Sequence, residues 1–229
     1  MIAENLKKIN NKINQIALQC GRNPHDIRVV AVSKKFPASV VKEAMEADQF
    51  LFGENYIQEA ILKRKELGNN ANLHFIGHLQ TNKAKIACQL FQMIETVDRL
   101  KLAKALNNHL ENNNLTLKIL IQVNIGRDPK KSGVLPEEAE NLIREVHLLP
   151  ALTICGLMTI PPYSQVAEES RIHFKALRLM AEKLVKNDLL GTTQPVELSM
   201  GMSNDYHIAI EEGATLVRIG TAIFGSRPY

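Results

Sequence analysis

The chain has 229 residues, 45% of them hydrophobic, and its 28 basic and 24 acidic side chains give a net charge of +4. This excess is too small, and the basic residues are too scattered, for a nucleic-acid-binding surface. The three cysteines, Cys20, Cys88 and Cys155, lie far apart, which argues against a disulfide framework and favours a reducing compartment. His74 and His78 fall in a predicted strand and turn rather than on one helical face, so we expect no metal site.

The N-terminal segment has the pattern of an amphipathic helix. Apolar residues recur at helical spacing, with lysines between them, at Ile2, Leu6, Ile9, Ile13 and Ile16. Gly21 is a typical residue at the end of such a helix. We therefore expect an extra N-terminal helix rather than a targeting segment. Because no apolar run is long enough to span a bilayer, we also expect a cytoplasmic protein without a membrane partner.

Predicted strands and helices alternate along the rest of the chain. We expect strands at residues 28–33, 50–53, 73–76, 92–96, 117–124, 152–157, 195–199 and 215–219. Helices are expected at 38–48, 55–67, 80–89, 98–111, 136–147, 165–187 and 203–212, the last of them capped by Ser203. This alternation favours an α/β fold, a single (β/α)8 TIM-type barrel domain over residues 1–229. An open doubly wound sheet is the alternative, but no Gly-x-Gly-x-x-Gly follows the first strand.

The chemistry of such a barrel is expected at the carboxyl ends of its strands. Lys34 directly follows the short β-branched run of the first strand. A partly desolvated amine at this place can lose its proton and condense with a carbonyl compound. An ordinary solvated lysine between strand and loop is the alternative interpretation.

Residues near the ends of the last two strands resemble a phosphate site, with Ser199 and Ser203 facing Gly220 and Thr221. Ordinary turn and cap residues would give the same pattern. Combined with a lysine across the barrel mouth, however, the pattern predicts a phosphorylated aldehyde, and pyridoxal phosphate is the obvious candidate. Arg218 precedes this turn and could donate to the pyridine nitrogen, which would then stay unprotonated and leave the ring a poor electron sink. An arginine that only ties down the barrel floor is the alternative.

Six segments are similar to one known family: 31–34, 52–56, 74–77, 156–158, 198–203 and 217–225. In them, and over residues 5–229 as a whole, the chain resembles the pyridoxal phosphate homeostasis protein family, which is itself similar to the N-terminal barrel of alanine racemase. The resemblance implies a single-domain, fold-type III barrel that holds the cofactor as an internal aldimine on Lys34.

The resemblance also implies roles for other residues. Arg218 matches the residue at the pyridine nitrogen, and Ser199, Gly220 and Thr221 match the phosphate cradle. Asn55 lies in a motif near the ring, and Lys131 matches a lysine connected with cofactor exchange.

Two positions depart from the family pattern. Some members carry a second lysine where this chain has Phe36, next to Lys35. His78 stands where proline is common.

The resemblance to alanine racemase raises the question of catalysis. Racemisation needs a second base opposite the lysine, which alanine racemase takes from a separate C-terminal domain of its partner subunit. Tyr56 and Tyr163 could substitute, but both have the character of packing residues. We therefore expect a monomeric carrier that buffers pyridoxal phosphate or delivers it to apo-enzymes, with no catalytic residues. A pyridoxal phosphate-dependent amino-acid racemase and a phosphosugar-binding barrel are the alternatives.

Overall fold

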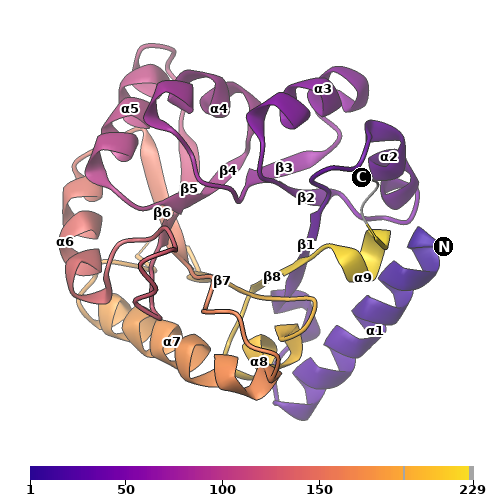
Figure 1. The fold of residues 1–229 in the computed structure, drawn as a ribbon. Helices are drawn as coiled ribbons and strands as arrows, with labels where there is room; N and C mark the ends of the chain where they lie inside the picture. Colours follow the sequence, from indigo (N-terminus) through magenta and orange to yellow (C-terminus); the bar gives the residue numbers. More distant parts are fainter. Residues whose placement is uncertain (193, 227–229) are drawn as a thin grey trace.

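The computed structural model describes residues 1–192 and 194–226. Within them, eight parallel strands close into a barrel in chain order: β1 (Arg28–Val32), β2 (Leu51–Glu54), β3 (Asn72–Phe75), β4 (Met93–Val97), β5 (Leu117–Gln122), β6 (Leu152–Met158), β7 (Glu197–Met202) and β8 (Leu216–Ile219). β8 pairs with β1 and completes the ring. Figure 1 shows this barrel end-on, surrounded by helices. The prediction of a closed (β/α)8 barrel is confirmed.

The helices follow the expected alternation. They are α1 (Ile2–Gln19), α2 (Ala38–Met45), α3 (Ile57–Leu67), α4 (Ala84–Leu90), α5 (Leu100–Glu111), α6 (Pro136–His147), α7 (Arg171–Lys186), α8 (Tyr206–Glu211) and α9 (Thr221–Phe224). The extra N-terminal helix is present as α1, which lies beside α8 and α9 (Figure 1). Its stripe of isoleucines is buried. None of the helices in the described part of the chain combines the length and apolar character that crossing a bilayer requires.

Five of the seven predicted helices start later than the sequence indicated, three of them by three residues or more. The helix expected at 80–89 begins at Ala84, after a 3-10 turn, η2 (Thr81–Lys83). The helix expected at 165–187 is divided into a 3-10 turn, η3 (Ala167–Ser170), and α7. The helix expected at 203–212 begins at Tyr206, so Ser203 is not its cap. The carboxylate of Asp205 accepts the Met202 N–H at 2.7 Å and holds residues 202–205 in a turn. This turn competes with the first helical turn, as side chains of this type do.

The barrel interior is built in layers. Side chains two residues apart share one face of a strand. Apolar Met93, Leu120 and Leu216 on three strands belong to a small buried cluster. Two positions further along the same strands are buried Glu95, Gln122 and Arg218. An apolar layer therefore supports a polar layer, and the polar layer lies towards the carboxyl ends of the strands, where barrels carry their sites.

Candidate functional site

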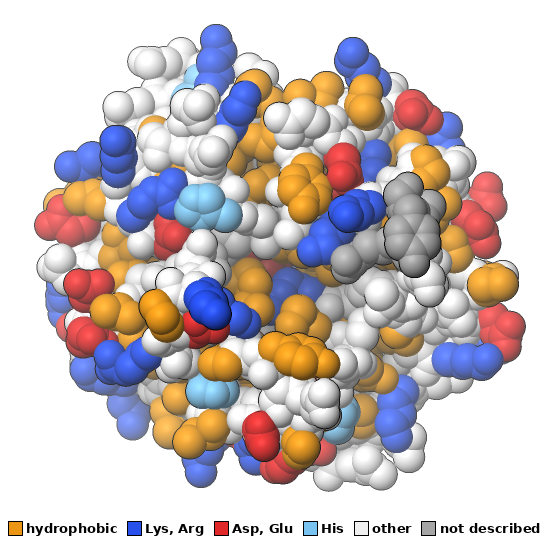
Figure 2. Space-filling model, viewed as in Figure 1, with side chains coloured by type: hydrophobic (Ala, Val, Ile, Leu, Met, Phe, Trp, Pro, Cys, Tyr) orange, Lys and Arg blue, Asp and Glu red, His pale blue; other side chains and the backbone are white. Residues whose placement is uncertain are grey.

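A cavity of about 310 Å³ opens at the carboxyl ends of the strands. Figure 2 shows this face hollowed over the middle of the barrel, with basic side chains at the rim and in the depth. Six of the predicted site residues line the cavity, namely Lys34, Asn55, Ser203, Arg218, Gly220 and Thr221. The structure therefore brings together residues from the ends of β1, β2, β7 and β8.

The turn that carries Lys34 is clamped on both sides. The Phe36 N–H donates to the Ser33 carbonyl at 3.1 Å, which closes a four-residue turn around Lys34 and Lys35. Lys63 on α3 donates to the same Ser33 carbonyl at 2.7 Å. The neighbouring Lys35 N–H donates to Glu59, also on α3, at 2.6 Å. Lys34 is half-buried between these fixed points and lines the cavity.

A buried ion pair supports this turn from below. Lys63 pairs with Glu54, and the Ser33 hydroxyl donates to the same carboxylate at 2.5 Å. Burial raises the pKa of Glu54, while the Lys63 charge and these hydrogen bonds oppose the increase. Both charged side chains are almost fully buried, so each depends on the other for stabilisation.

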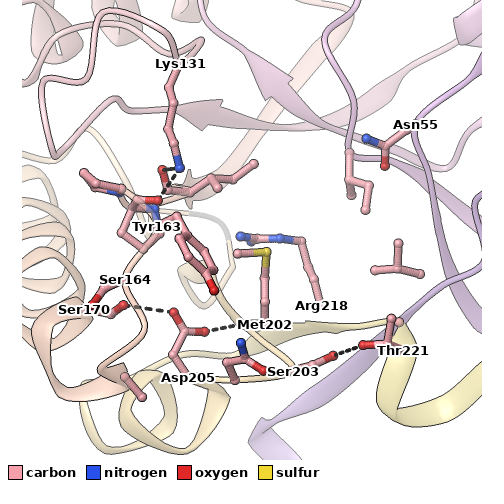
Figure 3. A pocket seen from close by; sticks show the side chains of 18 of the residues that line it. Asn55, Lys131, Tyr163, Ser164, Ser170, Met202, Ser203, Asp205, Arg218 and Thr221 are labelled. Atoms are coloured by element: carbon pink, nitrogen blue, oxygen red, sulfur yellow. Dashed lines mark hydrogen bonds between the residues drawn. The ribbon is translucent and has the colours of Figure 1, made fainter. Parts of the chain in front are cut away.

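Arg218 forms the floor of the cavity and is only 3% exposed. Its Nη1 donates to the Ser199 hydroxyl at 2.6 Å, and its Nη2 donates to the Thr159 carbonyl at 2.7 Å. A guanidinium has five N–H donors, so these two contacts leave others for a ligand. Figure 3 shows the guanidinium group in the middle of the pocket.

Ser203 and Thr221 form one end of the cavity. Their hydroxyl oxygens are 3.4 Å apart and project from the ends of β7 and β8 (Figure 3). Gly220 directly precedes α9, whose first N–H groups have no partners within the helix. Hydroxyl and backbone donors that converge in this way suit a phosphate group.

Ser199 does not belong to this end, and the expectation that it binds phosphate is corrected. β7 was expected to end at residue 199 but continues to Met202, so Ser199 lies within the barrel and has no exposed surface. Its hydroxyl accepts from Arg218 and donates to Glu95 Oε2 at 2.5 Å. The single hydroxyl proton is therefore already used.

Asn55 lines the cavity from the end of β2. Its Oδ1 is buried and has no hydrogen-bond partner. The backbone of Asn55 is held against Gly77, where a Cβ atom would approach the Asn55 carbonyl oxygen to 2.4 Å. A side chain at residue 77 would therefore displace Asn55.

The wall opposite Thr221 contains Lys131 and Tyr163 (Figure 3). The Lys131 amine donates to the Pro161 carbonyl, and burial lowers its pKa. Asp205, which the sequence analysis did not single out, also lines the cavity and accepts from the Ser170 hydroxyl at 3.0 Å. No sequence signal distinguished it from an ordinary cap residue.

The positions that depart from the family pattern lie outside this cavity. Phe36 is buried against Phe224, with ring centroids 5.2 Å apart, and Lys35 is exposed. His78 lines a smaller neighbouring cavity of about 190 Å³, and its Nδ1 lies 3.1 Å from the Ser132 hydroxyl.

The residues of the cavity fit a phosphorylated pyridine aldehyde. They offer an amine, a buried guanidinium with unused donors, an unpartnered amide oxygen and a hydroxyl pair. Within residues 1–192 and 194–226 no cluster of His, Cys, Asp or Glu side chains could hold a metal ion.

Comparisons with known proteins agree with this fit. The family model described as alanine racemase, N-terminal domain, matches residues 5–228. The chain is 43% identical to the pyridoxal phosphate homeostasis protein of Escherichia coli K12 and 41% identical to that of Haemophilus influenzae, and it covers 97% of each. The solved structure of PipY from Synechococcus elongatus with pyridoxal phosphate bound is 34% identical, with a TM-score of 0.85 over 98% of this chain and all of that one. The solved structure of an alanine racemase from Clostridium difficile is 17% identical and shares the fold, with a TM-score of 0.73. The match covers 99% of this chain and 58% of the racemase chain. The chain belongs to the pyridoxal phosphate homeostasis protein family.

Proposed function

We propose that this protein binds pyridoxal phosphate covalently through Lys34 and takes part in its homeostasis, by buffering the cofactor or delivering it to apo-enzymes. The observation that carries the proposal is the cavity that unites Lys34, Arg218 and the Ser203–Thr221 hydroxyl pair. The solved structure of the relative PipY with pyridoxal phosphate bound supports it.

Each part of the cavity has a defined task in this proposal. Bound pyridoxal phosphate supplies an aldehyde for covalent attachment and a ring that withdraws electrons. The Lys34 amine condenses with the aldehyde carbon, and one water molecule leaves. Arg218 donates to the ring nitrogen, while Ser203, Gly220 and Thr221 hold the phosphate. Asn55 lines the cavity on the side of the ring.

The same cavity favours a carrier over a racemase. Arg218 can only donate hydrogen bonds, so the ring nitrogen facing it stays neutral and the ring withdraws electrons weakly. Asp205 already accepts two hydrogen bonds, from Met202 and Ser170, which leaves it a poor proton carrier. Tyr163 is 79% exposed, so nothing fixes its hydroxyl opposite Lys34.

The proposal extends to the setting in which the protein works. We expect a single barrel domain over residues 1–229, acting as a monomer in the cytoplasm. A main buried core that includes residues from Ile2 to Phe224 and three free cysteines support this view.

The experiment that tests the function compares delivery with turnover. Purified protein loaded with pyridoxal phosphate is mixed with an apo-enzyme, and recovery of that enzyme's activity is compared with recovery from free cofactor. In parallel, α-proton exchange of amino acids is followed in deuterium oxide. Reactivation faster than with free cofactor, together with negligible exchange, supports delivery. Slow reactivation would restrict the role to buffering, and rapid exchange would overturn the carrier proposal in favour of a racemase.

A further inference from the structure

A chain of four buried polar side chains crosses the barrel interior beneath the cavity. Arg218 on β8 donates to Ser199 on β7 at 2.6 Å, and Ser199 donates to Glu95 on β4 at 2.5 Å. The other carboxylate oxygen of Glu95 lies 2.7 Å from Nδ1 of His74 on β3. None of the four side chains is more than 3% exposed. Only Arg218 among them lines the 310 Å³ cavity.

The direction of the hydrogen bond between Arg218 and Ser199 is fixed by chemistry. A guanidinium can only donate, so the Ser199 oxygen accepts from Arg218 and its proton turns to Glu95. An ionised Glu95 accepts from Ser199 and also from His74 when that histidine carries a proton on Nδ1. Burial by itself would raise the pKa of Glu95, but hydrogen bonds from His74 and Ser199 and the charge of Arg218 lower it below its ordinary value. Glu95 is thus a buried negative charge that reaches Arg218 through one hydroxyl.

This arrangement limits how the guanidinium can turn. Nη1 is held by Ser199 and Nη2 by the Thr159 carbonyl, which leaves the remaining donors at fixed positions in the cavity. Loss of the Ser199 hydroxyl would free one side of the guanidinium group, and loss of the Glu95 charge would remove a buried counter-charge of Arg218.

We infer that Glu95, acting through Ser199, is a positioning residue that orients Arg218 towards the ring nitrogen of bound pyridoxal phosphate. This inference rests on the proposed function. Because neither Glu95 nor Ser199 lines the cavity, any effect of changing them on ring recognition must pass through Arg218.

The test compares two ligands that differ at one atom. Dissociation constants are measured for pyridoxal phosphate and for its analogue in which a C–H group replaces the ring nitrogen and cannot accept a hydrogen bond. The unmodified protein should prefer pyridoxal phosphate. In Glu95→Gln and in Ser199→Ala this preference should fall by on the order of tenfold, with little change for the analogue. The ¹⁵N chemical shift of ring-labelled cofactor should move in both variants, since it reports the hydrogen bond directly.

A matched control separates positioning from a general loss of stability. Glu212 is also a buried carboxylate paired with arginines, Arg171 and Arg178, but it lies at the end of α8 away from the cavity. Glu212→Gln should leave the preference between the two ligands unchanged.

The outcomes distinguish the inference from the proposed function. An unmodified protein that does not bind pyridoxal phosphate would refute both. The inference alone would be refuted if the unmodified protein binds and prefers pyridoxal phosphate over the analogue, and Ser199→Ala and Glu95→Gln keep the same preference. If Glu95→Gln does not fold, Ser199→Ala decides, because it removes the bridge without removing a charge.

Discussion

Removal of the Thr221 hydroxyl should weaken pyridoxal phosphate and spare pyridoxal. Thr221→Val keeps the shape of the side chain and removes only its donor. In the proposed complex Thr221 and Ser203 both face the phosphate, and their hydroxyl oxygens are 3.4 Å apart. Pyridoxal lacks the phosphate, so it makes neither contact.

The magnitude follows from the type of hydrogen bond and from its exposure. A hydrogen bond to a charged group contributes roughly 1.5–3 kcal/mol. Thr221 is exposed at the cavity mouth, so water screens the phosphate and the lower end of this range applies. We therefore expect the dissociation constant for pyridoxal phosphate to rise by about tenfold in Thr221→Val and in Ser203→Ala. Because the two hydroxyls are neighbours, the double variant should lose less than the sum of both effects.

The assay is a fluorescence or absorbance titration of each variant with both ligands. Ser199→Ala is the control, since Ser199 contacts Arg218 at the ring end and both ligands carry the ring nitrogen. It should weaken pyridoxal phosphate and pyridoxal by the same factor. Equal losses for both ligands in Thr221→Val would refute the assignment of the phosphate end.

Three further variants or measurements test other parts of the account. Lys63→Met leaves the buried Glu54 carboxylate without its partner and should lower the free energy of unfolding, measured by urea denaturation, by about 3 kcal/mol. The control Lys65→Met, an exposed position on the same helix, should change this free energy by less than about 0.5 kcal/mol. Equal effects of the two substitutions would show that the buried ion pair does not support the turn that carries Lys34. Because burial lowers the pKa of Lys131, competitive acetylation followed by mass spectrometry should find its amine reactive at a lower pH than a free lysine side chain, and a coincident titration curve would contradict its burial. Arg218→Glu places an acid at the ring nitrogen and favours its protonation, so α-proton exchange with added amino acids in deuterium oxide should rise. If this variant still binds the cofactor but its exchange rate is unchanged, the neutral ring nitrogen is not what limits catalysis.

Much of the fold could be predicted because its local signals agree. The short β-branched run before Lys34 is typical of a buried parallel strand, and eight such runs alternate with helical patterns. Since barrels place their sites at the carboxyl ends of their strands, the order of the strands alone predicted that Lys34, Arg218 and Thr221 lie at the same end of the barrel. The structure brings all three to one cavity.

The differences arise where local sequence is ambiguous or contacts are distant. A strand end misplaced by three residues put Ser199 at the mouth instead of inside the barrel. Ser203, Asn204 and Asp205 are all good cap residues, so only the contact from Asp205 to Met202 decides where α8 begins. Glu95 gave no signal at all, because its partners lie on β3 and β7 and only barrel closure brings them together.

Covalent attachment of the cofactor at Lys34 is the central claim, and the most direct test is to locate the bond. The loaded protein is reduced with borohydride and digested, and the modified peptide is identified by mass spectrometry. We expect one pyridoxyl group, on the peptide that contains Lys34, and none in Lys34→Ala. Modification at Lys35 or Lys131 in place of Lys34, or a loaded protein that yields no reduced adduct, would contradict the account.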